Sequence, residues 1–356
     1  MSRNSHILDR WHDCNLNVYT NCRESGSLHT RKDHSCLNYT RGSFIPEIER
    51  LRGVAICLVI LSHVFVVTFE TNAGSFMLMA VRGTTWIFIF VAGFLFAHLV
   101  TGKTFISYLG AKLKYVLLPY IVLTTAILLA GVARDPSIKS DIGTLHLYYL
   151  LGYPVASPLW FVPMVVLFFL AFPIYRYLLQ TKALLPVLTL LFLLLSVLMG
   201  RPSFDSGAVT QFMYFQSAYL MGMLWRTHGG QANEMAQRFL PMAVVVCVAG
   251  IAAGGMYSGL IRDAQVFVML ALTGILMVVL KQDSAITRLA EFLAPLSFGM
   301  FFIHGTLTDR LEIWLGHAVP PAYALLLGVG VIIGSAGVVL AAKHAFGTRA
   351  RYVIGS

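Results

Sequence analysis

Long apolar segments follow one another along almost the whole chain after residue 50. A helix that crosses the hydrocarbon core of a bilayer needs roughly 20 consecutive apolar residues, and each segment is close to that length. The pattern predicts ten membrane-spanning helices, over residues 52–70, 84–101, 115–133, 159–179, 183–199, 208–226, 239–257, 264–280, 292–311 and 321–342. The predicted fold class is therefore all-α, a polytopic transmembrane bundle of about ten helices.

The beginning of the chain has a different character. Residues 1–44 are polar, rich in Ser, Asn, Arg and His, and contain neither an apolar run nor the apolar core of a signal peptide. We therefore expect a disordered cytoplasmic tail over 1–44, a transmembrane domain over 45–345 and a short basic cytoplasmic tail over 346–356.

The composition agrees with a membrane protein, since 57% of the residues are hydrophobic and 12% are charged, whereas a soluble domain has about 25% charged residues. The placement of the net charge of +10 indicates membrane topology rather than a nucleic-acid partner. With the tail inside the cell, 20 of the 26 Lys and Arg residues lie on the cytoplasmic side and 6 outside, as the positive-inside rule requires. We expect a multi-pass protein of the cytoplasmic (inner) membrane with both termini in the cytoplasm.

The sequence offers no pattern typical of a metal or nucleotide cofactor. Cys14, Cys22 and Cys36 lie among histidines, but their spacing fits no standard zinc site. The chain also lacks a glycine-rich phosphate loop and a serine-hydrolase elbow. We therefore expect no metal and no bound cofactor.

A histidine lies inside the first apolar segment. His63 follows Arg52 by 11 positions, or about three helical turns, so both side chains leave nearly the same helix face roughly 16 Å apart. That distance is about half the hydrocarbon thickness, and a titratable group at this depth is costly unless it faces a polar pocket. His63 is therefore a candidate functional residue; the alternative is a histidine that hydrogen-bonds a neighbouring helix.

The ninth apolar segment carries a second histidine. His304 follows Ser297 and lies about twelve residues into its predicted span, at a depth that matches His63. Both spans are predicted to run from the inside to the outside. Whether the two helices are in contact does not follow from the sequence.

Five short segments occur in the order typical of one family of membrane proteins. They are Arg52-Gly53 followed by His63, the Phe-rich Trp86–Leu95, the basic Lys112–Tyr120, Pro158–Val162 and the segment from Leu296 to His304. Together they resemble the acyltransferase 3 family of integral membrane proteins, over about residues 45 to 345. The resemblance implies an enzyme that transfers an acyl group, most often acetyl from acetyl-CoA, to a hydroxyl of a cell-surface or exported carbohydrate.

The resemblance also implies roles for individual residues. His63 is expected to act as the general base, because imidazole titrates near neutrality. Arg52, Lys112 and Lys114 are expected to bind the acyl-CoA, which is a co-substrate rather than a resident cofactor. The alternative for the lysines is the ordinary excess of positive charge on the cytoplasmic side.

Four further residues are candidates for the acceptor site or the pocket. They are Arg82, Trp160, Ser297 and His304. The alternatives are an aromatic belt for Trp160, a snorkelling anchor for Arg82, and hydrogen bonds between helices for Ser297 and His304.

The sequence departs from the family pattern in two respects. Ala92 replaces a serine that is usual there, so no nucleophile is assigned to it. Lysines replace arginines before Pro119, which favours point-charge attraction over bidentate phosphate binding. The main alternative function is a transporter or exporter of a glycan or lipid-linked sugar, although the spans show no repeated halves.

Overall fold

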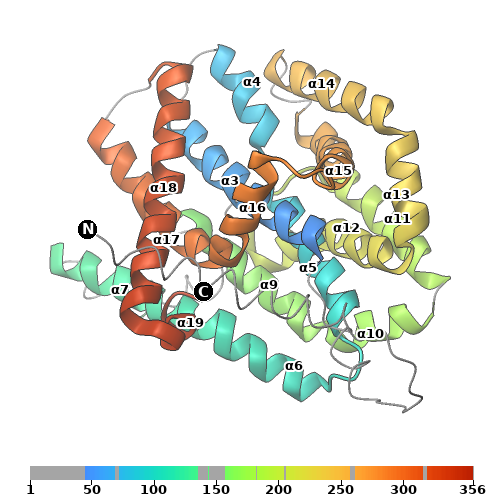
Figure 1. The fold of residues 1–356 in the computed structure, drawn as a ribbon, viewed down its shortest axis with the longest axis horizontal. Helices are drawn as coiled ribbons and strands as arrows, with labels where there is room; N and C mark the ends of the chain where they lie inside the picture. Colours follow the sequence, from blue (N-terminus) through green and yellow to red (C-terminus); the bar gives the residue numbers. More distant parts are fainter. Residues whose placement is uncertain are drawn as a thin grey trace, which may run out of the picture. The chain divides into compact units, whose positions relative to one another are not determined.

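The computed structural model describes residues 45–68, 72–134, 143, 157–181, 183–203, 206–256, 261–315 and 319–355. Every regular element over these residues is a helix, so the predicted all-α polytopic bundle is confirmed (Figure 1). The predicted tail over 1–44 and most of the loop 134–158 lie outside the described residues.

Every predicted apolar segment forms a helix. In chain order these helices are α3 (Pro46–Thr68), α5 (Thr85–Leu99), α7 (Leu118–Arg134), α9 (Phe161–Leu170), α10 (Phe172–Gln180), α11 (Leu184–Met199), α12 (Gly207–Thr227), α14 (Leu240–Met256), α15 (Ile261–Val279), α17 (Ser297–Leu315) and α18 (Pro321–Phe346).

Within the described ranges, four helical runs are long and apolar enough to cross a membrane: Phe76–Leu99, Phe105–Ala130, Ala285–Leu315 and Pro321–Phe346. The number rises to six if each of two bent pairs is one span, and two shorter apolar helices, Leu184–Met199 and Gln265–Val279, add to these. The chain is a multi-pass membrane protein.

One predicted span is broken in the middle. The segment 159–179 forms α9 and α10, which meet at Ala171 with a bend of 53°. Pro173 explains the break, because proline has no N–H to donate and its ring collides with the carbonyl four residues earlier.

The hydropathy pattern missed five short helices that link or end the spans. They are α4 (Asn72–Val81), α6 (Phe105–Lys112), α13 (Gly229–Arg238), α16 (Ala285–Leu293) and α19 (Ala350–Val353). A π-helical segment, Leu113–Leu117, joins α6 to α7. Their lengths of 4 to 10 residues are too short for a spanning pattern.

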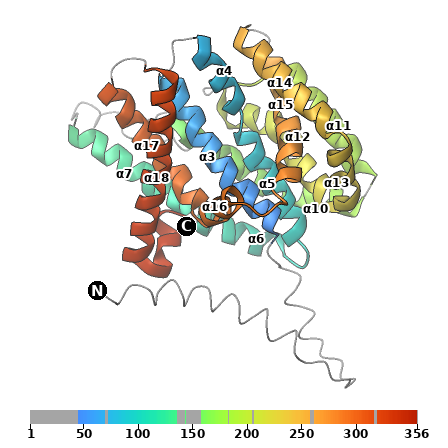
Figure 2. The same cartoon turned by 45° about the horizontal axis from the view of Figure 1, so that its top comes forward.

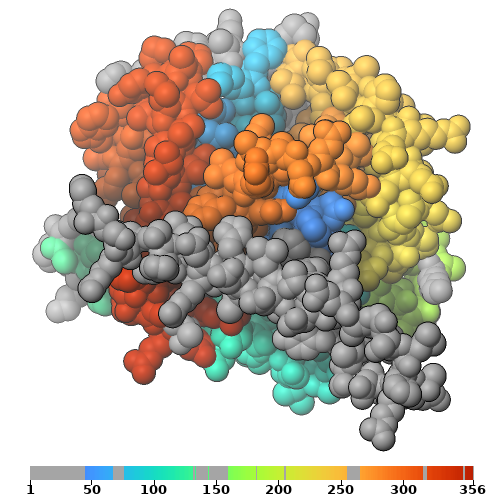
Figure 3. Space-filling model, in the orientation of Figure 1, coloured from blue at the N-terminus to red at the C-terminus, as the bar shows by residue number. Residues whose placement is uncertain are grey.

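Helix α3 is packed on several sides by other helices. It contacts α4, α5, α16, α17 and α18, and Figure 2 shows it between the α17–α18 pair and α5. Figure 3 shows the N-terminal end of α3, in blue, beside the orange segment that contains α16. The helix that carries Arg52 and His63 is therefore held within the bundle.

Three glycines allow neighbouring helices to approach closely. A Cβ on Gly53 would collide with the backbone of Ala290, so Gly53 allows α16 to lie directly on α3. A Cβ on Gly93 would collide with the carbonyl of Tyr219, and one on Gly222 with the carbonyl of Phe90. Small residues at such crossings are typical of packed membrane helices.

Candidate active site

The two buried histidines of the sequence are in contact. The ring centroids of His63 on α3 and His304 on α17 lie 5.1 Å apart, with an angle of 56° between the ring planes. Because α3 and α17 pack against each other, the matching depths of the two residues place the imidazoles side by side. The sequence predicted the depths; the structure adds the contact.

The surroundings of His304 determine which of its nitrogens carries the proton. Its Nδ1 lies 3.1 Å from the carbonyl oxygen of Met300, and a carbonyl only accepts, so Nδ1 is the donor. In the neutral ring Nε2 is then an acceptor, and it is buried with no hydrogen-bond partner among the described residues. His304 has 0% exposure. It therefore presents an unprotonated nitrogen in the interior.

His63 is more accessible than His304. Its burial is intermediate, whereas His304 is completely enclosed. His63 therefore keeps some accessible surface, whereas His304 keeps none.

Aromatic rings connect this histidine pair to Trp160. The ring centroids of Phe301 and His304 lie 5.7 Å apart, and those of Phe161 and Phe301 lie 5.0 Å apart. Trp160 lies beside Phe161 at 6.2 Å. With 5% exposure, Trp160 packs inside the protein and not on its lipid-facing surface.

Arg201 is a residue near the site that the sequence analysis did not select. It follows Gly200, which ends α11 with a φ of 59°, and its charge acts on His63. Its Nη1 is buried and makes no hydrogen bond within the described ranges. The available signal in the sequence is a charged residue directly after the end of an apolar helix. Taken alone, that signal bears only on membrane topology.

Arg82 is exposed and precedes α5. Its charge acts on Arg201. Electrostatic interactions therefore connect Arg82 with Arg201 and Arg201 with His63.

Arg52 and Ser297 meet at a single carbonyl group. The Nε and Nη2 of Arg52 donate to the oxygen of Ala294 at 2.9 Å and 2.6 Å, and the Ser297 hydroxyl donates to the same oxygen at 2.8 Å. Arg52 also pairs with Glu49 at 3.1 Å. Its Nη1 makes no hydrogen bond within the described part of the chain. Arg52 thus links α3 to the turn between α16 and α17.

Arg50 connects α3 to neighbouring parts of the fold. Its Nε donates to the Glu291 carboxylate at 2.7 Å and its Nη1 to the Leu280 carbonyl at 2.8 Å, and it also pairs with Asp283. These bonds attach the start of α3 to both ends of the segment between α15 and α16.

Lys112 and Lys114 point in different directions. The Lys112 ammonium lies over the rings of Tyr108 and Phe169, at 5.4 Å and 5.2 Å from their centroids. The Lys114 ammonium lies over Tyr352 at 5.0 Å. The two lysines therefore do not converge on one point.

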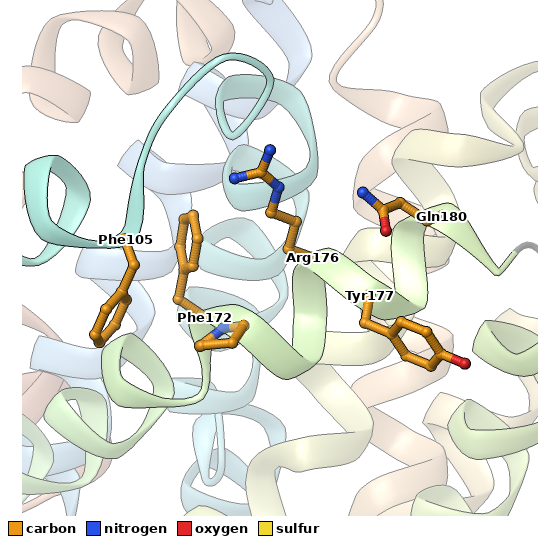
Figure 4. A pocket seen from close by; sticks show the side chains of 6 residues that line it. Phe105, Phe172, Arg176, Tyr177 and Gln180 are labelled. Atoms are coloured by element: carbon orange, nitrogen blue, oxygen red, sulfur yellow. The ribbon is translucent and has the colours of Figure 1, made fainter.

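An open cavity of about 350 Å³ lies at the start of α6 and along α10. Figure 4 shows Phe105 beside Phe172, with Arg176, Tyr177 and Gln180 on α10. None of the predicted site residues lines it. Among the described residues, no group of three or more His, Cys, Asp and Glu side chains is arranged to hold a metal ion.

Comparison with known proteins identifies the family. The family model described as "Acyltransferase domain", for the acyltransferase 3 group, matches residues 45–340. Searches of curated proteins and of solved structures gave no significant match. Since the matched region covers most of the 356 residues and contains the whole histidine and arginine arrangement described above, the chain belongs to the acyltransferase 3 family of membrane proteins.

Proposed function

We propose that the protein transfers an acetyl group from acetyl-CoA to a hydroxyl of a cell-surface or exported carbohydrate, with His63 as the general base. The observation that supports this most is the contact between a partly accessible His63 and a fully enclosed His304. A base needs access to the substrate, and it also needs a fixed orientation.

In the proposed reaction His63 removes the proton of the acceptor hydroxyl as its oxygen attacks the thioester carbonyl. The tetrahedral intermediate collapses, the carbon–sulfur bond breaks, and the imidazolium returns the proton to the thiolate of coenzyme A. His304 fixes the orientation of the base, because its ring packs against that of His63. His304 is thus a positioning residue.

Arg201 is our candidate for stabilising the negative oxygen of the tetrahedral intermediate. Its Nη1 N–H groups are buried and have no partner within the described ranges, and a preorganised donor in a dry site contributes strongly to such a step. Its charge also acts on His63, so the base and the donor act in the same region.

We assign the donor to the cytoplasmic side and the acceptor to the outer side. Arg52, Lys112 and Lys114 are the proposed donor-binding residues, Arg82 and Trp160 are the proposed residues of the acceptor side, and Ser297 and His304 shape the pocket. Of the donor residues, Arg52 keeps one guanidinium nitrogen for a ligand, and Lys114 is exposed.

The direct test follows labelled acetyl groups. The full-length protein in vesicles is given acetyl-labelled CoA inside and a hydroxylated glycan outside, and label on the glycan is measured. We expect transfer by the wild-type protein and loss of transfer in His63→Ala. Glycan that crosses the vesicle membrane while acetyl-CoA is not consumed would instead establish the transporter alternative.

A further inference from the structure

The C-terminal helix α19 brings basic and aromatic side chains onto the π-helical segment Leu113–Leu117. The Arg351 guanidinium lies 4.6 Å from the ring centroid of Tyr115, and the Lys114 ammonium lies 5.0 Å from that of Tyr352. The two tyrosine rings stack, with centroids 5.8 Å apart and planes at 20°. Each cation therefore lies on a ring from the other segment.

The position of α19 is fixed by its opposite face. Ala350 and Ile354 have exposures of 0% and 6%, and α19 packs on α7 and the π-helical segment, as Figure 1 shows near the C-terminus. Arg351 and Lys114 remain exposed. The buried face thus holds α19 in place, while the charged groups of Arg351 and Lys114 face the solvent.

Lys343 connects these two cations with Arg52. Lys343 on α18 donates to the Pro295 carbonyl at 3.2 Å, next to the Ala294 carbonyl that Arg52 binds. The charges of Arg52 and Arg351 both act on Lys343. The four cations Arg52, Lys343, Arg351 and Lys114 therefore form one group, which we name the C-terminal basic cluster.

The cluster has little negative charge of its own. Among the described residues, the ion pair it contains is that of Arg52 with Glu49, and no carboxylate lies within ion-pair distance of Lys114, Lys343 or Arg351. Lys114 and Tyr115 also lower the pKa of the Tyr352 hydroxyl, because both donate hydrogen bonds to its ionised form. Cations held close together without counter-charges favour a ligand with several negative charges.

We propose that the C-terminal basic cluster binds the phosphate groups of the nucleotide half of the acyl donor, with α19 as an essential part of that site. Arg351 supplies a planar guanidinium for phosphate oxygens, and Lys114 and Lys343 supply point charges. This inference rests on the proposed function for the identity of the ligand. The family match ends at residue 340, so α19 lies beyond it.

The test measures binding of coenzyme A itself, which carries the phosphates but no acyl group. Full-length protein in nanodiscs of neutral lipid is titrated by calorimetry at low salt. We expect Arg351→Ala and Lys114→Ala each to weaken binding roughly tenfold, as expected for a charge-assisted contact. Arg351→Lys should recover part of the loss, and 0.5 M salt should weaken wild-type binding markedly.

Arg349→Ala is the matched control. Arg349 is exposed and lies two residues before Arg351, so its removal changes the net charge equally. We expect it to bind coenzyme A within about twofold of the wild type. Unchanged binding in both Arg351→Ala and Lys114→Ala, or an equal loss in Arg349→Ala, would overturn the proposal.

An anionic lipid headgroup also carries phosphate and could bind the same cations. A second experiment therefore distinguishes coenzyme A from lipid as the ligand. If Arg351→Ala reduces retention of anionic lipid in native mass spectrometry but leaves coenzyme A binding intact, the cluster is a lipid site and the proposal is wrong. The proposed function fails separately: a wild type that binds coenzyme A through α19 yet transfers no acetyl group would keep this inference and reject that one.

Discussion

At the scale of single residues, the two histidines have different surroundings and, in our proposal, different roles. His63 is reachable and His304 is enclosed, although both lie at similar depth on adjacent helices. If His304 only orients His63, His304→Ala should lower kcat by about 10- to 100-fold with little change in KM. His304→Gln, which keeps an acceptor in the same place, should recover part of that rate in the acetyl-transfer assay. An effect of His304→Ala confined to KM would contradict this role.

Arg201 makes a second prediction at this scale. Replacement by Gln removes the buried guanidinium, and we expect kcat to fall by roughly 10²–10³-fold, as for the loss of one oxyanion donor. The control is Arg310→Gln, which removes an exposed arginine from the C-terminal half of α17. Equal rates for Arg201→Gln and Arg310→Gln would show that Arg201 takes no part in the chemistry.

At the scale of helices, the glycine of the Arg52-Gly53 motif is a packing residue. Gly53→Ala places a Cβ against the backbone of Ala290, and such overpacking costs about 1–3 kcal/mol. Thermal unfolding in detergent should show a lower midpoint for this variant. The control is Gly110→Ala in α6, where a Cβ meets open space, and there we expect no loss of stability. A Gly53→Ala protein as stable as the wild type would contradict the packing assignment.

The neighbouring arginine makes another prediction at this scale. Arg50 connects α3 to Glu291 and to the Leu280 carbonyl, and charge-assisted hydrogen bonds contribute about 1.5–3 kcal/mol. Arg50→Ala should therefore destabilise the folded protein more than Arg288→Ala, which removes an exposed arginine from α16. The comparison again uses the unfolding midpoint in detergent. An equal effect of both substitutions would mean that the Arg50 bonds contribute nothing measurable.

The sequence predicted the elements better than their contacts. Each of the ten predicted segments contains a helix, because an apolar segment in a bilayer must satisfy its backbone internally. Within the described ranges, however, four to six helical runs are long and apolar enough to span a membrane, fewer than the ten spans predicted. The criterion of apolar length missed α6, α16 and α19, since short helices at the ends of spans carry no such signal. The histidine depths were readable from helical rise, but the contact of His63 with His304 depends on how α3 and α17 pack. Arg201 was missed because a loop arginine looks the same whether it is buried or solvated.

At the scale of the whole molecule, the distribution of basic residues predicts the cytoplasmic side. By this rule we expect the C-terminal basic cluster on that side and Arg82 and Arg201 on the other. A green fluorescent protein fused after the C-terminus should therefore fluoresce, and alkaline phosphatase fused there should be inactive. Phosphatase fused after Ser203 should be active. The opposite pattern would place the basic cluster away from cytoplasmic acyl-CoA and contradict the proposed direction of transfer.

The central claim is that His63 is the base for acyl transfer, and a single comparison tests it most directly. Transfer of labelled acetyl from acetyl-CoA to a glycan is measured for wild type and His63→Ala, after equal folding has been verified by unfolding midpoint. Loss of a general base lowers the rate by about 10²–10⁴-fold, so we expect His63→Ala to lose at least a hundredfold in kcat while still binding coenzyme A. A folded His63→Ala protein that transfers acetyl at the wild-type rate would contradict the account.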